Sequence, residues 1–77
     1  MNKKMKFKLE DIFNKNEIEL ISKSNRIEDR VYTIDELRLI RNNIINGIFS
    51  RSSKNEDIQK ANEEFYDIIE KFDKVCS

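Results

Sequence analysis

Histidine is absent from the 77 residues of this sequence, and cysteine and glycine occur once each. Without histidine, the chain lacks the side chain that most often serves as a general base and as a transition-metal ligand. The single cysteine, Cys76, has no second thiol for a disulfide or a zinc site and no evident base to activate it. The single glycine, Gly47, cannot build a phosphate-binding loop. We therefore expect no enzyme activity, catalytic residue, metal, cofactor or small-molecule substrate.

Proline is also absent, and no stretch approaches the roughly 20 apolar residues that a membrane-spanning helix needs. Turns must then be made by Asn, Ser and Lys, which disfavours a strand-rich fold with many tight hairpins. The N-terminal lysines are not followed by an apolar run, so we expect no signal peptide. A lone cysteine suits a reducing compartment, and a cytoplasmic location is predicted.

What the sequence does contain is a regular apolar stripe near its C-terminal end. Six apolar residues follow one another at spacings of three, four, three, four and three: Ile58, Ala61, Phe65, Ile68, Phe72 and Val75. This period predicts a helix from Lys54 to Lys74 with one buried face. Its other face carries acid-first pairs at four-residue spacing, which stabilise exposed helices: Glu56 with Lys60, Asp67 with Lys71, and Glu70 with Lys74.

A second helix is predicted to begin at Ile34. Thr33 and Glu36 have the spacing of a capping box, and Tyr32 and Leu37 have that of a hydrophobic staple. The apolar face of this helix comprises Ile34, Leu37, Ile40, Ile44, Ile45 and Ile48, with Phe49 at the end. Gly47 either allows a neighbouring helix to approach closely or marks where this helix begins to end.

The N-terminal third is less regular. We predict a flexible basic tail over residues 1–8 and a short helix over residues 17–24, capped by Asn16 with Glu19. In the alternative, Ile18 and Leu20 lie in a strand that pairs with residues 9–13 across an Asn-rich turn. The alternation of Met5 and Phe7 with lysines also permits a short strand, and residues 31–32 can be extended.

These elements predict one all-α domain spanning residues 1–77. Its C-terminal half is an antiparallel helical hairpin, and a shorter N-terminal helix covers it. Charge supports the pairing, because residues 37–53 hold three arginines and no acid (+3), whereas residues 56–74 hold three lysines and seven acids (−4). The alternative fold is α+β, with a short N-terminal β-hairpin.

Function is predicted to lie in binding. The favoured hypothesis is a non-catalytic module that binds another protein, or a second copy of itself, through the apolar helical face. The residues of that face are Ile58, Phe65, Ile69, Phe72 and Cys76, and the same stripe can instead be intramolecular core. Tyr66 lies beside the stripe as a candidate contact residue.

The alternative hypothesis is a small nucleic-acid-binding regulator of a bacterial chromosome, phage or mobile element. Its candidate contacts are Lys3, Lys4, Lys6, Lys8, Arg38, Arg41, Asn42, Arg51 and Lys54, since Arg and Asn read base edges and Lys binds phosphates. Fifteen basic and fifteen acidic residues leave no net charge to attract nucleic acid. Arginines that pair with the acidic helix are the competing explanation.

Overall fold

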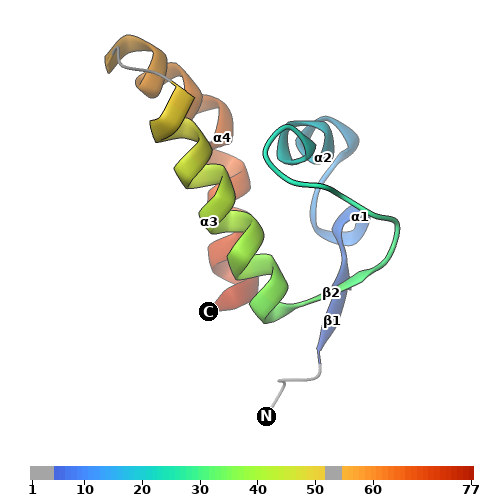
Figure 1. The fold of residues 1–77 in the computed structure, drawn as a ribbon. Helices are drawn as coiled ribbons and strands as arrows, with labels where there is room; N and C mark the ends of the chain where they lie inside the picture. The colour runs from blue at the N-terminus through green and yellow to red at the C-terminus, as the bar shows by residue number, and fades with distance from the viewer. Residues whose placement is uncertain (1–4, 52–54) are drawn as a thin grey trace.

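The computed structural model describes residues 5–51 and 55–77, with side chains for 5–48, 59–60 and 62–77. The described chain is mostly helical and carries a small two-stranded sheet (Figure 1). The elements follow in the order β1 (Lys6–Lys8), α1 (Leu9–Ile12), α2 (Lys15–Ser22), β2 (Val31–Thr33), α3 (Ile34–Arg51) and α4 (Asn55–Cys76).

Helices α3 and α4 form the predicted antiparallel hairpin. Helix α3 begins at Ile34 as expected, and its capping box is confirmed. The Glu36 amide donates to Thr33 Oγ1 at 3.2 Å, and the Thr33 amide donates to Glu36 Oε1 at 3.0 Å. Gly47 does not end the helix, which continues to Arg51. Between the helices lies a core that includes Leu37, Ile44, Ile68 and Phe72, all nearly or completely buried.

The two-stranded sheet corrects part of the N-terminal prediction. Strand β1 pairs antiparallel with β2, with Phe7 opposite Tyr32. A short strand after Met5 and an extended segment at residues 31–32 were both open alternatives. The alternative in which residues 9–13 pair with a strand through Ile18 and Leu20 was wrong, because residues 9–12 and 15–22 are helical, and the predicted helix through Ile18 is present. The predicted flexible tail does not include Lys6–Lys8, which are hydrogen-bonded in the sheet.

Helix α2 is present, but its start was misplaced by two residues. The cap is Asn14, whose Oδ1 accepts from the Glu17 amide while Glu17 Oε1 accepts from the Asn14 amide, both at 2.9 Å. Asn16 and Glu19 repeat the same spacing two residues later, so local sequence could not separate the two boxes. Glu17 is the one that is buried.

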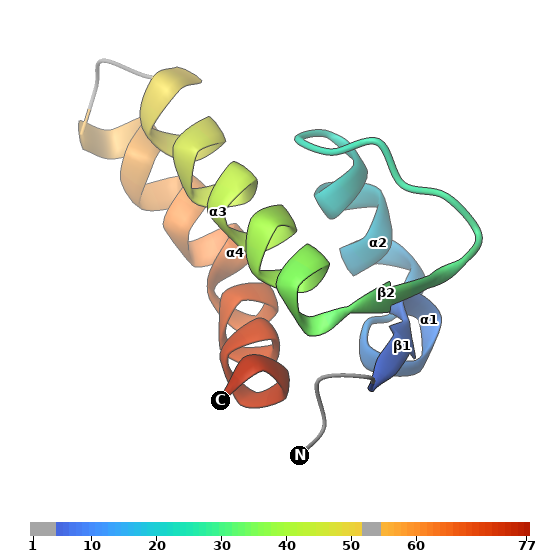
Figure 2. The ribbon, with the colours of Figure 1, turned by 60° about the horizontal axis from the view of Figure 1, so that its bottom comes forward.

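The N-terminal unit (β1, α1, α2 and β2) packs against one side of the hairpin, as two views show (Figures 1 and 2). Phe13 contacts Phe72 with ring centroids 4.8 Å apart. Lys71 donates to Glu17 at 2.6 Å, so it does not form the predicted pair with Asp67. Asn43 donates to Asn25 at 2.9 Å. These contacts come from the inner face of the hairpin, defined here by Ile40, Asn43, Gly47, Lys71 and Phe72.

Among the residues described, no helix is both long and apolar enough to cross a lipid bilayer.

Candidate interaction face

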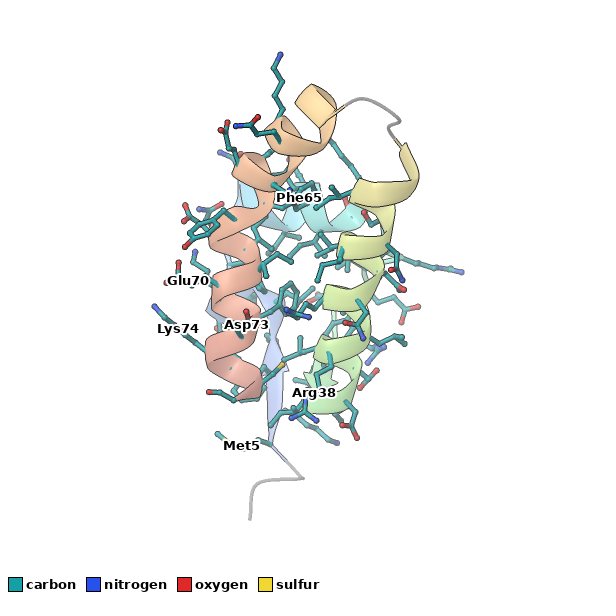
Figure 3. The ribbon with its side chains drawn as sticks, turned by 90° about the vertical axis from the view of Figure 1, so that its left-hand side faces the viewer. Met5, Arg38, Phe65, Glu70, Asp73 and Lys74 are labelled. Atoms are coloured by element: carbon teal, nitrogen blue, oxygen red, sulfur yellow. The ribbon has the colours of Figure 1, made fainter. Side chains whose placement is uncertain are left out.

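The opposite side of the hairpin is not covered by the N-terminal unit (Figure 3). We call this side the outer face. It is defined by Arg38, Arg41, Asn42, Ile45 and Ile48 from α3 and by Asn62, Phe65, Tyr66, Ile69, Glu70, Asp73 and Cys76 from α4. In Figure 3 the two helices lie side by side in front, with the strand and helices of the N-terminal unit behind them.

A groove of about 360 Å³ runs along the middle of the outer face. The groove is lined mainly by apolar side chains, because each helix contributes an isoleucine next to its buried residues, Ile45 from α3 and Ile69 from α4. Ile45 follows the fully buried Ile44, and Ile69 follows the nearly buried Ile68. The residues that line the groove are Ile45, Ile48, Asn62, Phe65, Tyr66, Ile69, Glu70 and Asp73.

Tyr66 is the most exposed aromatic side chain among the residues described, at 67% of its accessible surface. Large apolar side chains that are exposed beside an apolar groove mark interaction sites more often than isolated ones do. Leu39 is almost as exposed, at 61%, but it does not line the groove. Leu39 is therefore a control for Tyr66: both side chains are exposed, but only Tyr66 lies beside the apolar groove.

Charged side chains of both signs lie beside the groove, and each of them is paired within the chain. On the α3 side, Arg38 Nη2 donates to the Cys76 carbonyl at 3.0 Å, and Arg38 lies 3.7 Å from Asp35. On the α4 side, Glu70 lies 3.7 Å from Lys74. The two sides meet where Arg41 Nε approaches Asp73 Oδ1 at 2.7 Å, an ion pair rather than an aligned hydrogen bond.

A more polar hollow continues from the groove towards the chain's C-terminal end, lined by Arg38, Arg41, Asn42, Asp73, Cys76 and Ser77. Burial raises the pKa of the Cys76 thiol, against the opposing effect of the nearby Arg38 charge. The Cys76 Sγ lies 4.0 Å from the Ile34 carbonyl oxygen. A thiol with a raised pKa is a weak nucleophile at neutral pH.

The predicted interaction residues separate into three groups. Phe65, Ile69 and Cys76 lie on the outer face, although Phe65 is mostly buried. Phe72 is fully buried against Phe13 and belongs to the core, as the competing explanation anticipated. The side chain of Ile58 lies outside the described residues.

The predicted nucleic-acid contacts are not brought together at one site. Arg38, Arg41 and Asn42 share the polar hollow, whereas Lys6 and Lys8 are exposed on β1. Arg41 is engaged by Asp73 of the acidic helix, which is the pairing that the charge distribution predicted. Lys3, Lys4 and Lys54 lie outside the described residues, as does the side chain of Arg51, which ends α3.

Sequence reasoning did not assign Ile45, Ile48, Asn62, Glu70 and Asp73 to the candidate site. A usable signal was present, because the apolar residues of α3 include both Ile44 and Ile45, just as α4 includes both Ile68 and Ile69. Such doublets widen the apolar stripe beyond what one neighbouring helix covers. Read together, the two doublets predict an apolar strip on the same side of the hairpin.

Comparisons of the chain with protein-family models, with curated proteins and with solved structures find no match.

Proposed function

We propose that this protein is a small non-catalytic module that binds an amphipathic helix of another protein chain along its outer face. The observation that supports the proposal is the groove between α3 and α4, which is apolar along its centre and open to solvent. Helix-in-groove binding uses this arrangement, in which an apolar stripe of the partner fills the groove and its polar side faces water.

The edges of the groove indicate which kind of helix fits. Glu70 and Asp73 line the groove on its α4 side, whereas Arg38 and Arg41 line the polar hollow beside it. A partner helix with basic residues on the flank that lies along α4 would meet Glu70 there. Charges at the edge of an interface contribute mainly to orientation and specificity, while the apolar centre supplies the binding energy.

Nucleic acid is the competing partner class, and the outer face suits it less well. Asp73 already neutralises Arg41, and Glu70 lies on the same face, where it would repel a phosphate backbone. Binding to duplex DNA or to RNA that is strong at low salt and falls steeply with added salt would favour the nucleic-acid hypothesis instead.

Site-specific photo-crosslinking tests the proposal on the intact chain. A benzophenone amino acid is incorporated at position 66, in the groove, and in a matched variant at position 39, which is nearly as exposed but lies outside the groove. Each variant is irradiated in lysate of the native cell, with and without nuclease. We expect a discrete protein adduct from position 66 that is insensitive to nuclease and is lost in the background of Ile69→Lys.

Two outcomes would contradict the proposal. One is an equal adduct pattern from positions 39 and 66, which would show that exposure alone determines contact. The other is an adduct that disappears on nuclease treatment, which would identify nucleic acid as the partner. Circular dichroism of Ile69→Lys checks that the helices remain folded, because Ile69 is half-buried.

A further inference from the structure

We infer that the open edge of β1 binds an extended segment of another protein chain, in which acidic and apolar residues alternate. This site belongs to the N-terminal unit and is separate from the outer face, so the inference goes beyond the proposed function and does not depend on it. Two observations support it: the backbone groups that β1 leaves unpaired, and the lysine side chains beside them.

The register of the sheet shows which backbone groups β1 directs away from β2. Lys6 lies opposite Thr33. The Thr33 amide donates to Glu36 Oε1 at 3.0 Å, so it is not available to Lys6. In an antiparallel pair, residues that exchange both hydrogen bonds alternate with residues that direct their N–H and C=O groups outwards. Phe7 therefore exchanges its hydrogen bonds with β2, and the backbone groups of Lys6 and Lys8 face outwards.

The outer edge of β2 is closed by side chains of the same chain. Arg30 Nη1 donates to the Val31 carbonyl at 3.0 Å, and Glu36 accepts from the Thr33 amide. Arg30 and Glu36 are themselves paired at 2.7 Å, which holds both side chains in place. The Thr33 carbonyl lies at the cap of α3 and accepts the first hydrogen bond of that helix. Among the described residues, only the Val31 amide of this edge is then left without a partner.

The outer edge of β1 is open by comparison. Lys8 is the N-cap of α1, so its carbonyl accepts the first hydrogen bond of that helix. The Lys6 amide, the Lys6 carbonyl and the Lys8 amide have no hydrogen-bonding partner within residues 5–51 and 55–77. Both lysines are exposed to solvent. An added strand would find two amides and one carbonyl at alternate residues, which is the pattern that β-strand addition uses.

The side chains of β1 indicate which sequence the added strand carries. Lys6 and Lys8 lie on one face of the sheet and Phe7 lies on the other, because side chains alternate along a strand. Lys6 forms no ion pair with a described residue. Lys8 approaches Glu10 at 3.9 Å, but both side chains are exposed, and such pairs contribute little. Acidic residues opposite the lysines, with an apolar residue between them beside Phe7, would match both faces.

The same lysines disfavour a second copy of β1 as the added strand. Antiparallel pairing of two β1 strands would place the lysines of one copy opposite the lysines of the other. Like charges directly opposite each other destabilise a sheet, and lysines on an edge strand prevent pairing between identical edges. An acidic strand converts the same charges into an attraction, so the edge selects a different chain.

NMR titration tests the inference on the intact chain labelled with ¹⁵N. The probe is the capped peptide Glu-Val-Glu-Val-Glu, which has the required alternation. We expect saturable shifts of the Lys6 and Lys8 amides, with a dissociation constant on the order of 100 μM to 1 mM because only three main-chain hydrogen bonds form. N-methylation of the peptide's glutamates, whose amides face β1, should weaken binding about fivefold or more. N-methylation of its valines, whose amides face away from β1, should leave the affinity nearly unchanged.

A charge reversal gives the second test. The double variant Lys6→Glu with Lys8→Glu should bind the acidic peptide about tenfold more weakly or worse, and should instead bind Lys-Val-Lys-Val-Lys. Unchanged amide shifts in α3 and α4 confirm its fold, and the single variant Lys6→Gln replaces it if those shifts change.

Three outcomes would overturn the inference. The first is the absence of a saturable shift at Lys6 and Lys8 up to about 5 mM peptide. The second is equal weakening by the two N-methylated peptides, which would show attraction between charges without strand addition. The third is slow hydrogen exchange of the Lys6 and Lys8 amides in the free protein, since an open edge requires both to exchange faster than the Phe7 amide. Shifts centred on Tyr66 and Ile69 would place the peptide on the outer face and would likewise contradict binding at β1.

Discussion

The inner and outer faces of the hairpin differ in the kind of contact they use. The inner face holds the N-terminal unit by directional contacts: the Lys71–Glu17 pair, the Asn43–Asn25 hydrogen bond and the tilted Phe72–Phe13 stack. The outer face has an open apolar groove with charged side chains beside it. Directional polar contacts fix one arrangement, whereas an apolar centre with a charged rim has the composition of a surface that associates with another molecule. The difference assigns stability to the inner face and, under the proposed function, binding to the outer face.

The largest expected effect is on the free energy of unfolding, and it compares one aromatic residue from each face. Phe72 is fully buried on the inner face, so Phe72→Ala should lower the free energy of unfolding by about 3–5 kcal/mol. Tyr66 is exposed on the outer face, so Tyr66→Ala should change it by less than about 0.5 kcal/mol. Urea denaturation in dilute solution measures both. A similar loss for the two variants would remove the distinction between the faces.

If Phe72→Ala proves too unstable for a complete unfolding curve, Phe72→Leu serves in its place. Leucine fills most of the ring's volume, so the loss should be smaller but still clearly greater than that of Tyr66→Ala.

The next effect compares a charged pair from each face. Lys71→Met removes the ammonium 2.6 Å from the carboxylate of Glu17, a residue only 9% exposed. Because the buried carboxylate loses its partner, we expect a loss of about 1–2 kcal/mol. Arg38→Met, on the outer face, removes an exposed pair at 3.7 Å and should cost less than about 0.5 kcal/mol. Thermal denaturation at neutral pH checks both values.

A titration adds a more specific readout to the Lys71→Met variant. Burial raises the pKa of Glu17, but the hydrogen bonds from Lys71 and the Asn14 amide, with the Lys71 charge, outweigh it and lower the pKa overall. Without Lys71, the effect of burial should gain weight and the Glu17 pKa should rise above its wild-type value. An unchanged carboxyl titration by NMR would show that the pair has no energetic role.

The pH dependence of stability should also depend on an ion pair away from the outer face, the one between Arg30 and Glu36. The hydrogen bond from Arg30, at 2.7 Å, lowers the pKa of Glu36 to about 2, with help from the Thr33 amide. The folded state therefore binds fewer protons than the unfolded state between about pH 4.5 and pH 2. Stability should be full above that window and fall as the pH drops through it. Arg30→Met should raise the Glu36 pKa towards its ordinary value, so this pH-dependent loss of stability becomes smaller and its window narrows from the acid end, whereas Arg38→Met should leave the loss unchanged.

Sequence reasoning succeeded where one local interaction determined the structure. The cap at Thr33 and Glu36 depends on four consecutive residues, and it placed the start of α3 correctly. The pattern from Phe65 to Phe72 likewise predicted the buried side of α4. In both cases the residues that determine the structure lie within two turns of helix of one another, so their spacing in the sequence is enough to predict it.

Sequence reasoning failed where two local interactions were equally compatible with the sequence and a contact with a distant residue determined which of them forms. Lys71 has the spacing to pair with Asp67, yet it reaches Glu17 from α2, 54 residues away in the chain. The same contact favours the cap at Asn14 over the one at Asn16, because Glu17 belongs to that capping box. The pairing of β1 with β2 is also non-local, and neither strand predicts its partner by itself.

The smallest expected effect probes the closest approach on the inner face. A Cβ added at Gly47 would lie 3.3 Å from Ser24 Oγ and 3.9 Å from Ser24 Cβ. Alanine is favoured over glycine inside a helix by about 1 kcal/mol, and the serine hydroxyl can rotate away. We therefore expect Gly47→Ala to stabilise the protein by about 0.5 kcal/mol, and by nearer 1 kcal/mol when Ser24→Ala removes the hydroxyl. A double-mutant cycle from thermal denaturation measures this coupling. Destabilisation in both backgrounds would mean that the segment after α2, at Ser24, approaches α3 too closely for any side chain at position 47.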